Sequence, residues 1–241
     1  MQTLALRRAR PMLGTLVEIN LPAGSEQACF ALGFAAIAEV QACLSRFDPG
    51  SDVAHFNAAA AGTHLRLRAH SLRVLRAALA LQNASLGLFD ISQGSGPLGW
   101  RVEQDRLLKL EHAVTLNLGG IAKGFAVDQG VKALRQAGLA WASVNAGGDL
   151  RVFGPQTVAL KLRQEQGGGV CDFGQLADGA FATSHFSDSS RSRLSGGGVT
   201  RHVSVAAPRC IWADALTKIV AASGDTAHPL LARLGASAWL H

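Results

Sequence analysis

Three short segments of this sequence place glycines or polar residues beside charged ones, in combinations that suit a phosphate-bearing ligand. In the first, Gly119-Gly120 ends an expected strand, and Lys123 lies in the first turn of the helix that follows. Free backbone N–H groups and the positive end of a helix attract an anion, and glycine lets a ligand approach the backbone. The pattern matches neither the Walker loop nor the dinucleotide-binding glycine motif. A turn followed by a solvated lysine explains this segment equally well.

The second segment, residues 145–149, joins two expected strands through Gly147-Gly148 and ends in Asp149. A carboxylate after two glycines can face a ligand, but glycine and aspartate are also common in hairpin turns. On turn chemistry alone, the hairpin is the simpler interpretation.

The third segment opens a helix with Asp214, Thr217 and Lys218, which lie three and four residues apart and therefore share one helix face. A carboxylate and a hydroxyl at the start of a helix can hold a hard metal ion, or they can cap the helix. Asp90, at the mouth of a glycine-rich stretch, is similarly either part of a ligand clamp or part of a turn. None of these segments identifies a function by itself.

The elements that position these groups are predicted from the spacing of apolar residues, which alternates in strands and follows the helical period in helices. The expected strands are near residues 13–20, 113–118, 141–146, 149–153, 157–162, 180–184, 202–206 and 236–240, and the expected helices near 25–45, 71–86, 122–137, 213–223 and 226–235. Several strands follow one another without intervening helices. The pattern therefore favours an α+β fold, with mixed or antiparallel sheets flanked by helices, over a doubly wound parallel sheet. The length fits a single two-lobed domain, residues 1–241.

Side-chain spacing also predicts how the helices pack. The first helix should bury a stripe formed by Phe30, Phe34, Ile37, Val40 and Leu44. The second should begin at Ser71 as its N-cap and turn inward Leu72, Leu75, Leu79 and Leu86. The third should stop at Gly138. The serine- and glycine-rich stretch 185–200 is expected to be a mobile loop.

Composition narrows the class of protein. The chain is 48% hydrophobic and 17% charged with a net charge of +6, but it has no block of five like charges and only 6% aromatic residues, so a nucleic-acid platform is not expected. Its longest uncharged apolar stretch, 28–38, is too short for a membrane span. No secretory signal is recognised, which makes the cytoplasm the expected location. The four scattered cysteines are typical of small buried residues in a reducing compartment.

Taken together and in this order, the segments resemble the ApbE family of FAD:protein FMN transferases over almost the whole chain. The most specific match is residues 119–128, which are similar to the family's Gly-Gly-Ile-Ala-Lys-Gly-Tyr-x-x-Asp core. The other matching segments are residues 12–15, 51–57, 89–90, 145–149, 182–184 and 214–216.

The resemblance implies that FAD is the substrate and that its FMN half is transferred to a threonine or serine hydroxyl of an acceptor redox protein, with release of AMP. It also implies residue roles. The expected FAD-binding residues are Met12, Thr15, Asp90, Gly119, Gly120, Lys123, Asp128, Asp149, Thr183 and Ser184. Magnesium, or manganese in its place, is expected on the Ala122 carbonyl, Asp214 and a hydroxyl at the end of the late motif. Lys123, Asp214 and His202 are the expected catalytic residues.

The sequence departs from the family pattern at three positions. Lys218 stands where the family's final threonine ligand is expected, and an ammonium cannot ligate a cation. Either it points away and leaves Thr217 as a substitute ligand, or it takes the metal's place and contacts phosphate. His202 is the best match to the family's histidine although the following Asp-Pro is missing, and His185 is a rival. Asn117 replaces an aspartate before the glycine pair.

These departures leave two further functions open. An FAD pyrophosphate hydrolase of the same fold would release FMN and AMP without a protein acceptor. A non-catalytic flavin-binding protein would have kept the fold while its metal site degraded.

Overall fold

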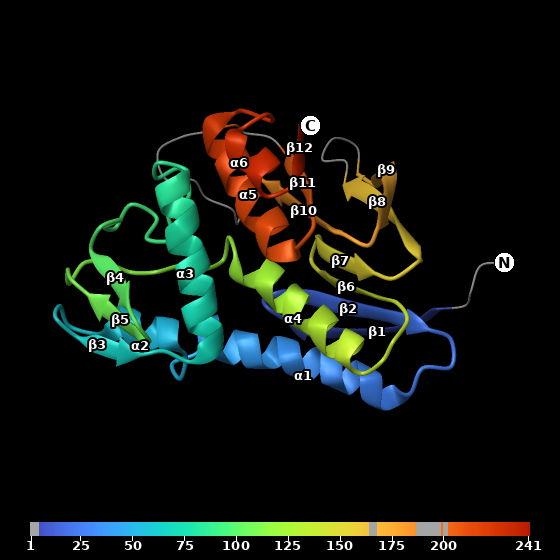
Figure 1. The fold of residues 1–241 in the computed structure, drawn as a ribbon, viewed down its shortest axis with the longest axis horizontal. Coiled ribbons are helices and arrows are strands. Elements are labelled where there is room, and N and C mark those ends of the chain that lie inside the picture. The colour runs from blue at the N-terminus through green and yellow to red at the C-terminus, as the bar shows by residue number, and fades with distance from the viewer. Residues whose placement is uncertain (1–4, 164–167, 187–198, 200–201) are drawn as a thin grey trace.

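A computed structural model describes residues 5–163, 168–186, 199 and 202–241. Its largest sheet has seven strands in the order β1-β2-β6-β7-β10-β11-β12, and all neighbours run antiparallel (Figure 1). The strands are β1 (Ala5–Met12), β2 (Thr15–Pro22), β6 (Ala142–Ala146), β7 (Asp149–Phe153), β10 (Ala180–His185), β11 (His202–Ala207) and β12 (Ser237–Leu240).

Three long helices, α1 (Gln27–Leu44), α4 (Ala122–Gln136) and α5 (Cys210–Ser223), lie along one face of this sheet. Helices α4 and α5 pack directly on the strands, and α1 packs on α4. The remaining helices are α2 (Asp52–Ala58), α3 (Ala69–Ala84) and α6 (Pro229–Arg233). A small sheet of β3 (His64–Arg66), β5 (Arg106–Lys109) and β4 (Trp100–Glu103) lies beside α3 (Figure 1).

The opposite face of the large sheet is covered in part by the hairpin of β8 (Thr157–Arg163) and β9 (Val170–Ala177). Because side chains alternate along a strand, neighbouring residues contribute to different cores. Ala180 and Ala182 belong to the main core under the helices, whereas Phe181 joins a second apolar cluster with Leu160 and Leu176 of the hairpin.

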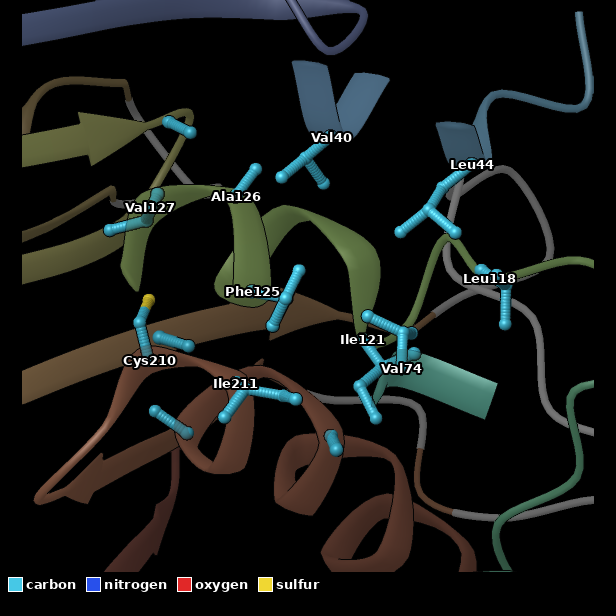
Figure 2. Close-up of a cluster of buried hydrophobic side chains, with 14 of the residues drawn as sticks. Val40, Leu44, Val74, Leu118, Ile121, Phe125, Ala126, Val127, Cys210 and Ile211 are labelled. Carbon is cyan, nitrogen blue, oxygen red and sulfur yellow. The ribbon is translucent and has the colours of Figure 1, made fainter. Parts of the chain in front are cut away.

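Helix α4 is the centre of the main core. Figure 2 shows Phe125 and Val127 of α4 among side chains from three other helices, including Val40 of α1, Val74 of α3 and Ile211 of α5. All of these side chains are at most 3% exposed. Because α4 is packed on several sides, the residues at its first turn are held at fixed positions relative to the sheet.

The α+β prediction is confirmed, as is the buried stripe of α1: each of its five residues is at most 4% exposed. Gly138, two residues after the end of α4, has a φ of 80°, the left-handed conformation of a helix stop. Other details were wrong. Helix α3 begins before Ser71, which is buried inside it, and Leu86 is 95% exposed.

Residues 113–118 do not form the predicted strand. Their backbone groups bond to other segments instead: Leu116 N–H donates to Asn57 Oδ1 at 2.7 Å, and Asn57 Nδ2 donates back to the Leu116 carbonyl at 3.0 Å. The expected helix at 213–223 begins earlier, at Cys210, and α6 is shorter than predicted. The predicted mobile loop lies almost entirely outside the described residues.

Helix α1 is the one described helix that is long and apolar enough to cross a membrane, with a mean hydropathy of 1.5. Its apolar stripe packs against α4 in this fold, and this packing explains why the helix is rich in apolar residues. The four cysteines are unpaired; Cys43 and Cys210 are buried, and Cys29 and Cys171 are partly exposed.

Candidate functional site

Four charged side chains from α4, β7 and α5 gather beside the large sheet. The ammonium of Lys123 forms an ion pair with the carboxylate of Asp149, and Lys218 Nζ lies 2.6 Å from Asp214 Oδ1. The two carboxylates are almost completely buried, with exposed side-chain fractions of 1% and 0%. The side chain of Lys123 is 31% exposed, so it is the member of the cluster that an incoming ligand reaches most directly.

Turns at one end of the sheet bring these residues together. Asp149 opens β7 directly after the glycine turn, and Asn145 Oδ1 accepts a hydrogen bond from Gly148 N–H at 3.0 Å. A Cβ on Gly147 would lie 2.3 Å from Thr15 Oγ1 and its φ is 62°, so only glycine fits under the β1–β2 turn. Thr15, at the start of β2, therefore shapes the site by packing against the Gly147-Gly148 turn.

Helices α4 and α5 cap each other. Asp214 of α5 accepts a hydrogen bond through Oδ2 from Gly124 N–H in the first turn of α4, at 3.1 Å. Asp128 of α4 accepts from the N–H groups of Cys210 and Ile211, the first residues of α5, at 3.0 and 3.1 Å. Each carboxylate satisfies otherwise unpaired N–H groups at the start of the other helix.

Burial and charge act in opposite directions on the ionisation of this cluster. Burial disfavours the charged form of Lys123, but Asp149 and Asp214 raise its pKa above the ordinary lysine value. Burial likewise opposes ionisation of Asp214, but the ammonium groups of Lys218 and Lys123 hold its pKa below the ordinary value. Burial and the charge of Asp214 raise the pKa of Asp149 to about 6, against the opposing effect of Lys123. Lys123 and Asp214 belong to one cluster, because Gly124, the residue after Lys123, donates its N–H to Asp214 Oδ2 at 3.1 Å.

The side chain of Lys218 does not point away but folds back onto Asp214, and its contact with phosphate stays a prediction. Its Nζ donates to Asp214 Oδ1 at 2.6 Å, to the Asp214 carbonyl at 3.1 Å and to Ser184 Oγ at 3.0 Å. The other candidate ligand, Thr217, is fully buried and donates its hydroxyl proton to the Asp214 carbonyl at 2.7 Å.

The predicted magnesium ligands therefore do not fit a divalent metal. Both oxygens of the Asp214 carboxylate are engaged, one by the Lys218 ammonium and the other by Gly124 N–H. Ala122 lies beside this cluster in the wall of an adjoining pocket. Among the residues that the structure describes, no group of three or more His, Cys, Asp or Glu side chains gathers in a way that could hold a metal.

One pocket opens beside Lys123, and a second pocket adjoins the first. The first has a volume of about 180 Å³ and is mostly apolar; Leu13, Val40, Leu118 and Gly119 contribute to its wall, and Lys123 lies at its edge. The second, of about 450 Å³, is more polar and is lined by the loop around Gln93. Together they offer an apolar and a polar compartment along one surface.

The two pockets share three wall residues, Arg46, Phe47 and Asn117. Sequence reasoning missed Arg46 and Phe47, which follow α1 directly. The Arg46 guanidinium lies 4.6 Å from the centroid of the Phe47 ring, and Phe47 is 82% exposed. An aromatic residue beside an arginine, outside the apolar stripe of the preceding helix, was the available signal.

Asn117, predicted only as a departure from the family pattern, organises the approach to α4. Its Oδ1 accepts a hydrogen bond from Gly119 N–H at 3.0 Å, and its Nδ2 donates to Gln93 Oε1 at 3.0 Å. Gln41 was also missed; its Oε1 accepts from Leu13 N–H at 2.7 Å and so holds the β1–β2 turn against α1. Met12, in the same turn, packs against the main core.

Two predicted FAD-binding carboxylates hold the protein's own backbone. Asp128 caps α5 and lies within 3.6 Å of Arg151 and Arg209. Asp90 accepts hydrogen bonds from Ser92 N–H, Ser92 Oγ and Gly94 N–H at 2.7, 2.9 and 2.9 Å. Asp90 therefore fixes the loop that lines the larger pocket.

Thr183 and His202 lie on the other face of the sheet from Asp214. Thr183 Oγ1 bonds to Ser204 Oγ at 2.7 Å, and the preceding and following residues, Ala182 and Ser184, face the helices. The ring of His202 stacks on His185 with centroids 4.3 Å apart, and on His241 at 5.5 Å. The two candidate histidines are thus cross-strand neighbours, and a catalytic role for either stays a prediction.

The fold and site define an α+β protein in which two lysines and two buried carboxylates form a cluster, and Lys123 of this cluster borders a mostly apolar pocket. The model of the ApbE family matches residues 13–106 and 97–239, and the chain belongs to this family. No curated protein sequence matches it.

Several solved structures share the fold. The apo flavinyl transferase ApbE from Pseudomonas stutzeri superposes with a TM-score of 0.81 at 21% identity, covering 100% of this chain and 91% of the other. The flavin transferase ApbE from Vibrio cholerae gives 0.83 at 18% identity, covering 99% and 93%. The ApbE protein from Thermotoga maritima gives 0.84 at 20% identity, covering 98% and 94%. The predicted fold is therefore confirmed.

Proposed function

We propose that this protein is a flavin transferase that moves the FMN moiety of FAD to a threonine or serine hydroxyl of an acceptor protein and releases AMP. Family membership and the names of the structural neighbours support transfer of a flavin. The observation that carries the proposal is the Lys123 ammonium, which is partly exposed and borders the mostly apolar pocket.

The pockets suit the parts of FAD. An isoalloxazine ring is flat and largely apolar, and it matches a pocket walled by Leu13, Val40 and Leu118. The diphosphate would lie at the Gly119-Gly120 turn, where Lys123 and the positive end of α4 favour an anion. The polar pocket lined by Asn57 and Gln93 would then take the adenosine end.

In the transfer step, the acceptor hydroxyl oxygen forms a bond to the phosphorus of the FMN half. The bond between that phosphorus and the bridging oxygen breaks, AMP leaves with the bridging oxygen, and the hydroxyl proton is released to solvent. The protein contributes position and positive charge, as in other phosphoryl transfers. Magnesium has no role in this step, because Lys218 and Gly124 engage both carboxylate oxygens of Asp214.

The test is an incubation of the purified protein with FAD and an acceptor domain that carries a candidate threonine or serine. AMP is measured by chromatography and covalent flavin by in-gel fluorescence of the acceptor. We expect both products from the unaltered protein and a loss of about 10²–10³ in rate from Lys123→Met. Lys132→Met, an exposed lysine on the same helix, is the matched control and should leave the rate unchanged.

Other outcomes would contradict the proposal in distinct ways. AMP release without labelled acceptor would identify an FAD pyrophosphate hydrolase. Bound FAD without AMP, with magnesium or manganese present or absent, would identify a non-catalytic flavin-binding protein.

A further inference from the structure

We infer that the ammonium group of Lys218 is a built-in cation that takes the place of a divalent metal at Asp214, so that this protein processes FAD without an added metal ion. The inference rests on the proposed function and concerns the source of positive charge at the same site.

The ammonium of Lys218 lies in an oxygen environment that would also suit a metal ion. Three oxygen atoms from two residues surround Lys218 Nζ: Asp214 Oδ1 at 2.6 Å, the Asp214 carbonyl at 3.1 Å and Ser184 Oγ at 3.0 Å. Carboxylate, carbonyl and hydroxyl oxygens are also the ligands that a hard divalent cation takes. A lysine has three N–H donors, and here each finds one of these oxygens.

The surroundings also accommodate the whole side chain of Lys218. A Cβ on Gly120 would lie 3.1 Å from Lys218 Cε and 3.4 Å from its Cγ, so the missing side chain at this glycine leaves room for the lysine stem. Only 14% of the Lys218 side chain is exposed. The ammonium is thus held under the glycine turn at the start of α4, on the side of the proposed diphosphate site.

The Lys218 ammonium also compensates the negative charge of the Asp214 carboxylate. Asp214 is fully buried, and a buried carboxylate needs a compensating cation. In this chain Lys218 supplies that charge permanently. A metal ion would have to displace the ammonium from Oδ1, and it would then leave two cations competing for one buried carboxylate.

The experiment compares metal binding in the unaltered protein with Lys218→Thr, which introduces the hydroxyl that the family pattern has at this position. Lys132→Thr, the same exchange at an exposed position of α4, is the matched control. Each protein is freed of metal, Mn²⁺ is titrated with FAD present, and free Mn²⁺ is followed by electron paramagnetic resonance. Thermal melting with and without Mg²⁺ shows whether each variant is folded.

We expect Lys218→Thr to bind Mn²⁺ at least ~10-fold more tightly than the unaltered protein and Lys132→Thr do. Mg²⁺ should raise the melting temperature of Lys218→Thr and leave those of the other two proteins unchanged. Stoichiometric Mn²⁺ binding by the unaltered protein would overturn the inference. If Lys218→Thr does not fold, Lys218→Met, which removes the charge and keeps the length, is titrated instead and is expected to release Asp214 for Mn²⁺.

An activity measurement separates this inference from the proposed function. AMP release from FAD that persists with EDTA, together with covalent flavin on the acceptor, supports both the inference and the proposed function. AMP release that needs Mg²⁺ overturns the inference and leaves the flavin-transfer proposal standing. If no condition releases AMP, the proposed function fails, and the Mn²⁺ titration still decides what occupies the cation position at Asp214.

Discussion

At the scale of single residues, the ion pair of Lys123 and Asp149 links ligand binding to stability. Asp149 is 1% exposed and depends on Lys123 for compensation of its charge. Burial and the nearby Asp214 already raise the pKa of Asp149 to about 6, which shows how poorly this position tolerates a lone negative charge. A change at either residue therefore affects the folded state as well as the ligand.

We expect Lys123→Met to lower the free energy of unfolding by about 3 kcal/mol, the lower end for a broken buried pair, because Lys123 is partly exposed and its charge is screened. The double variant Lys123→Met, Asp149→Asn should recover most of this loss, since it removes the uncompensated carboxylate. It should not recover affinity for FAD. Urea denaturation measures the free energy of unfolding, and quenching of flavin fluorescence measures the affinity for FAD. Recovery of FAD binding in the double variant would show that Lys123 does not contact the ligand.

Sequence motifs predicted the charged residues of the site better than they predicted which way side chains face. Lys123, Asp149 and Asp214 come together as expected. Thr183 and Ser184 were both expected at FAD, yet adjacent residues of a strand point to opposite faces, and only Ser184 contacts the lysine cluster. The role of Asp128 as a helix cap depends on a contact across 82 residues and could not be recognised from local sequence.

At the scale of secondary-structure elements, the close approach of α4 and α5 depends on Gly124. A Cβ at this position would lie 2.3 Å from the Cys210 carbonyl oxygen and 2.8 Å from Asp214 Cβ. Backbone atoms cannot move aside as a flexible side chain can. Glycine is normally unfavourable inside a helix, so packing here outweighs helix propensity.

Gly124→Ala should therefore destabilise the protein by about 1–3 kcal/mol, as expected for an overpacked core. Gly130→Ala on the same helix is the matched control, because its Cβ would meet the flexible Ile37 side chain at 3.0 and 3.1 Å and would lie 3.6 Å, an ordinary contact distance, from the Gly33 carbonyl oxygen. The control should be close to neutral, since Ala favours helix by up to about 1 kcal/mol. Midpoints of urea unfolding test the pair, and equal effects of the two substitutions would show that the α4–α5 contact is not tight.

The elements that sequence reasoning missed carry weak local signals. Strand β1 is an edge strand, exposed along most of its length and rich in arginine, so it lacks the alternation of a half-buried strand. Strands β3, β4 and β5 have only three or four residues each. The segment 113–118 alternates like a strand, but its hydrogen bonds go to Asn57 and to the Ile91 carbonyl.

At the scale of the whole molecule, stability should depend on pH through the last strand of the large sheet. His241 follows β12, bonds to Ser204 Oγ at 2.9 Å and stacks on His202. Burial lowers the pKa of His241 below 6.5, and the electrostatic effect of the neighbouring His202 lowers it further. As pH falls through 6.5, the unfolded chain takes up this proton before the folded protein does, and the folded state is destabilised.

We therefore expect the melting temperature to fall between about pH 7 and pH 5.5, more steeply in the unaltered protein than in His241→Gln. Above pH 7 the histidine is neutral in both states and the two proteins should show parallel behaviour. Differential scanning calorimetry across this range provides the measurement. If the melting temperature fell with pH equally steeply in both proteins, titratable groups other than His241 would cause the pH dependence.

The two-part pocket is a property of the complete fold. Arg46 and Phe47 follow α1, Asn117 precedes α4, and the β1–β2 turn is distant from all three in sequence. Only the packing of α1 on α4 brings these segments to one surface, which explains why no single motif indicated the shape of the cavity. The family match, in contrast, could be recognised from the order of its short segments along the chain.

The reciprocal capping of α4 and α5 sets the separation of the two ammonium groups. Lys123 extends from one helix and Lys218 from the other, and the capping carboxylates prevent the helices from sliding past each other. The site therefore holds these two positive charges at fixed positions relative to a bound anion. We expect it to favour a dinucleotide over flavin mononucleotide, because a diphosphate that contacts Lys123 also extends into the field of the Lys218 ammonium, whose N–H donors stay on Asp214 and Ser184.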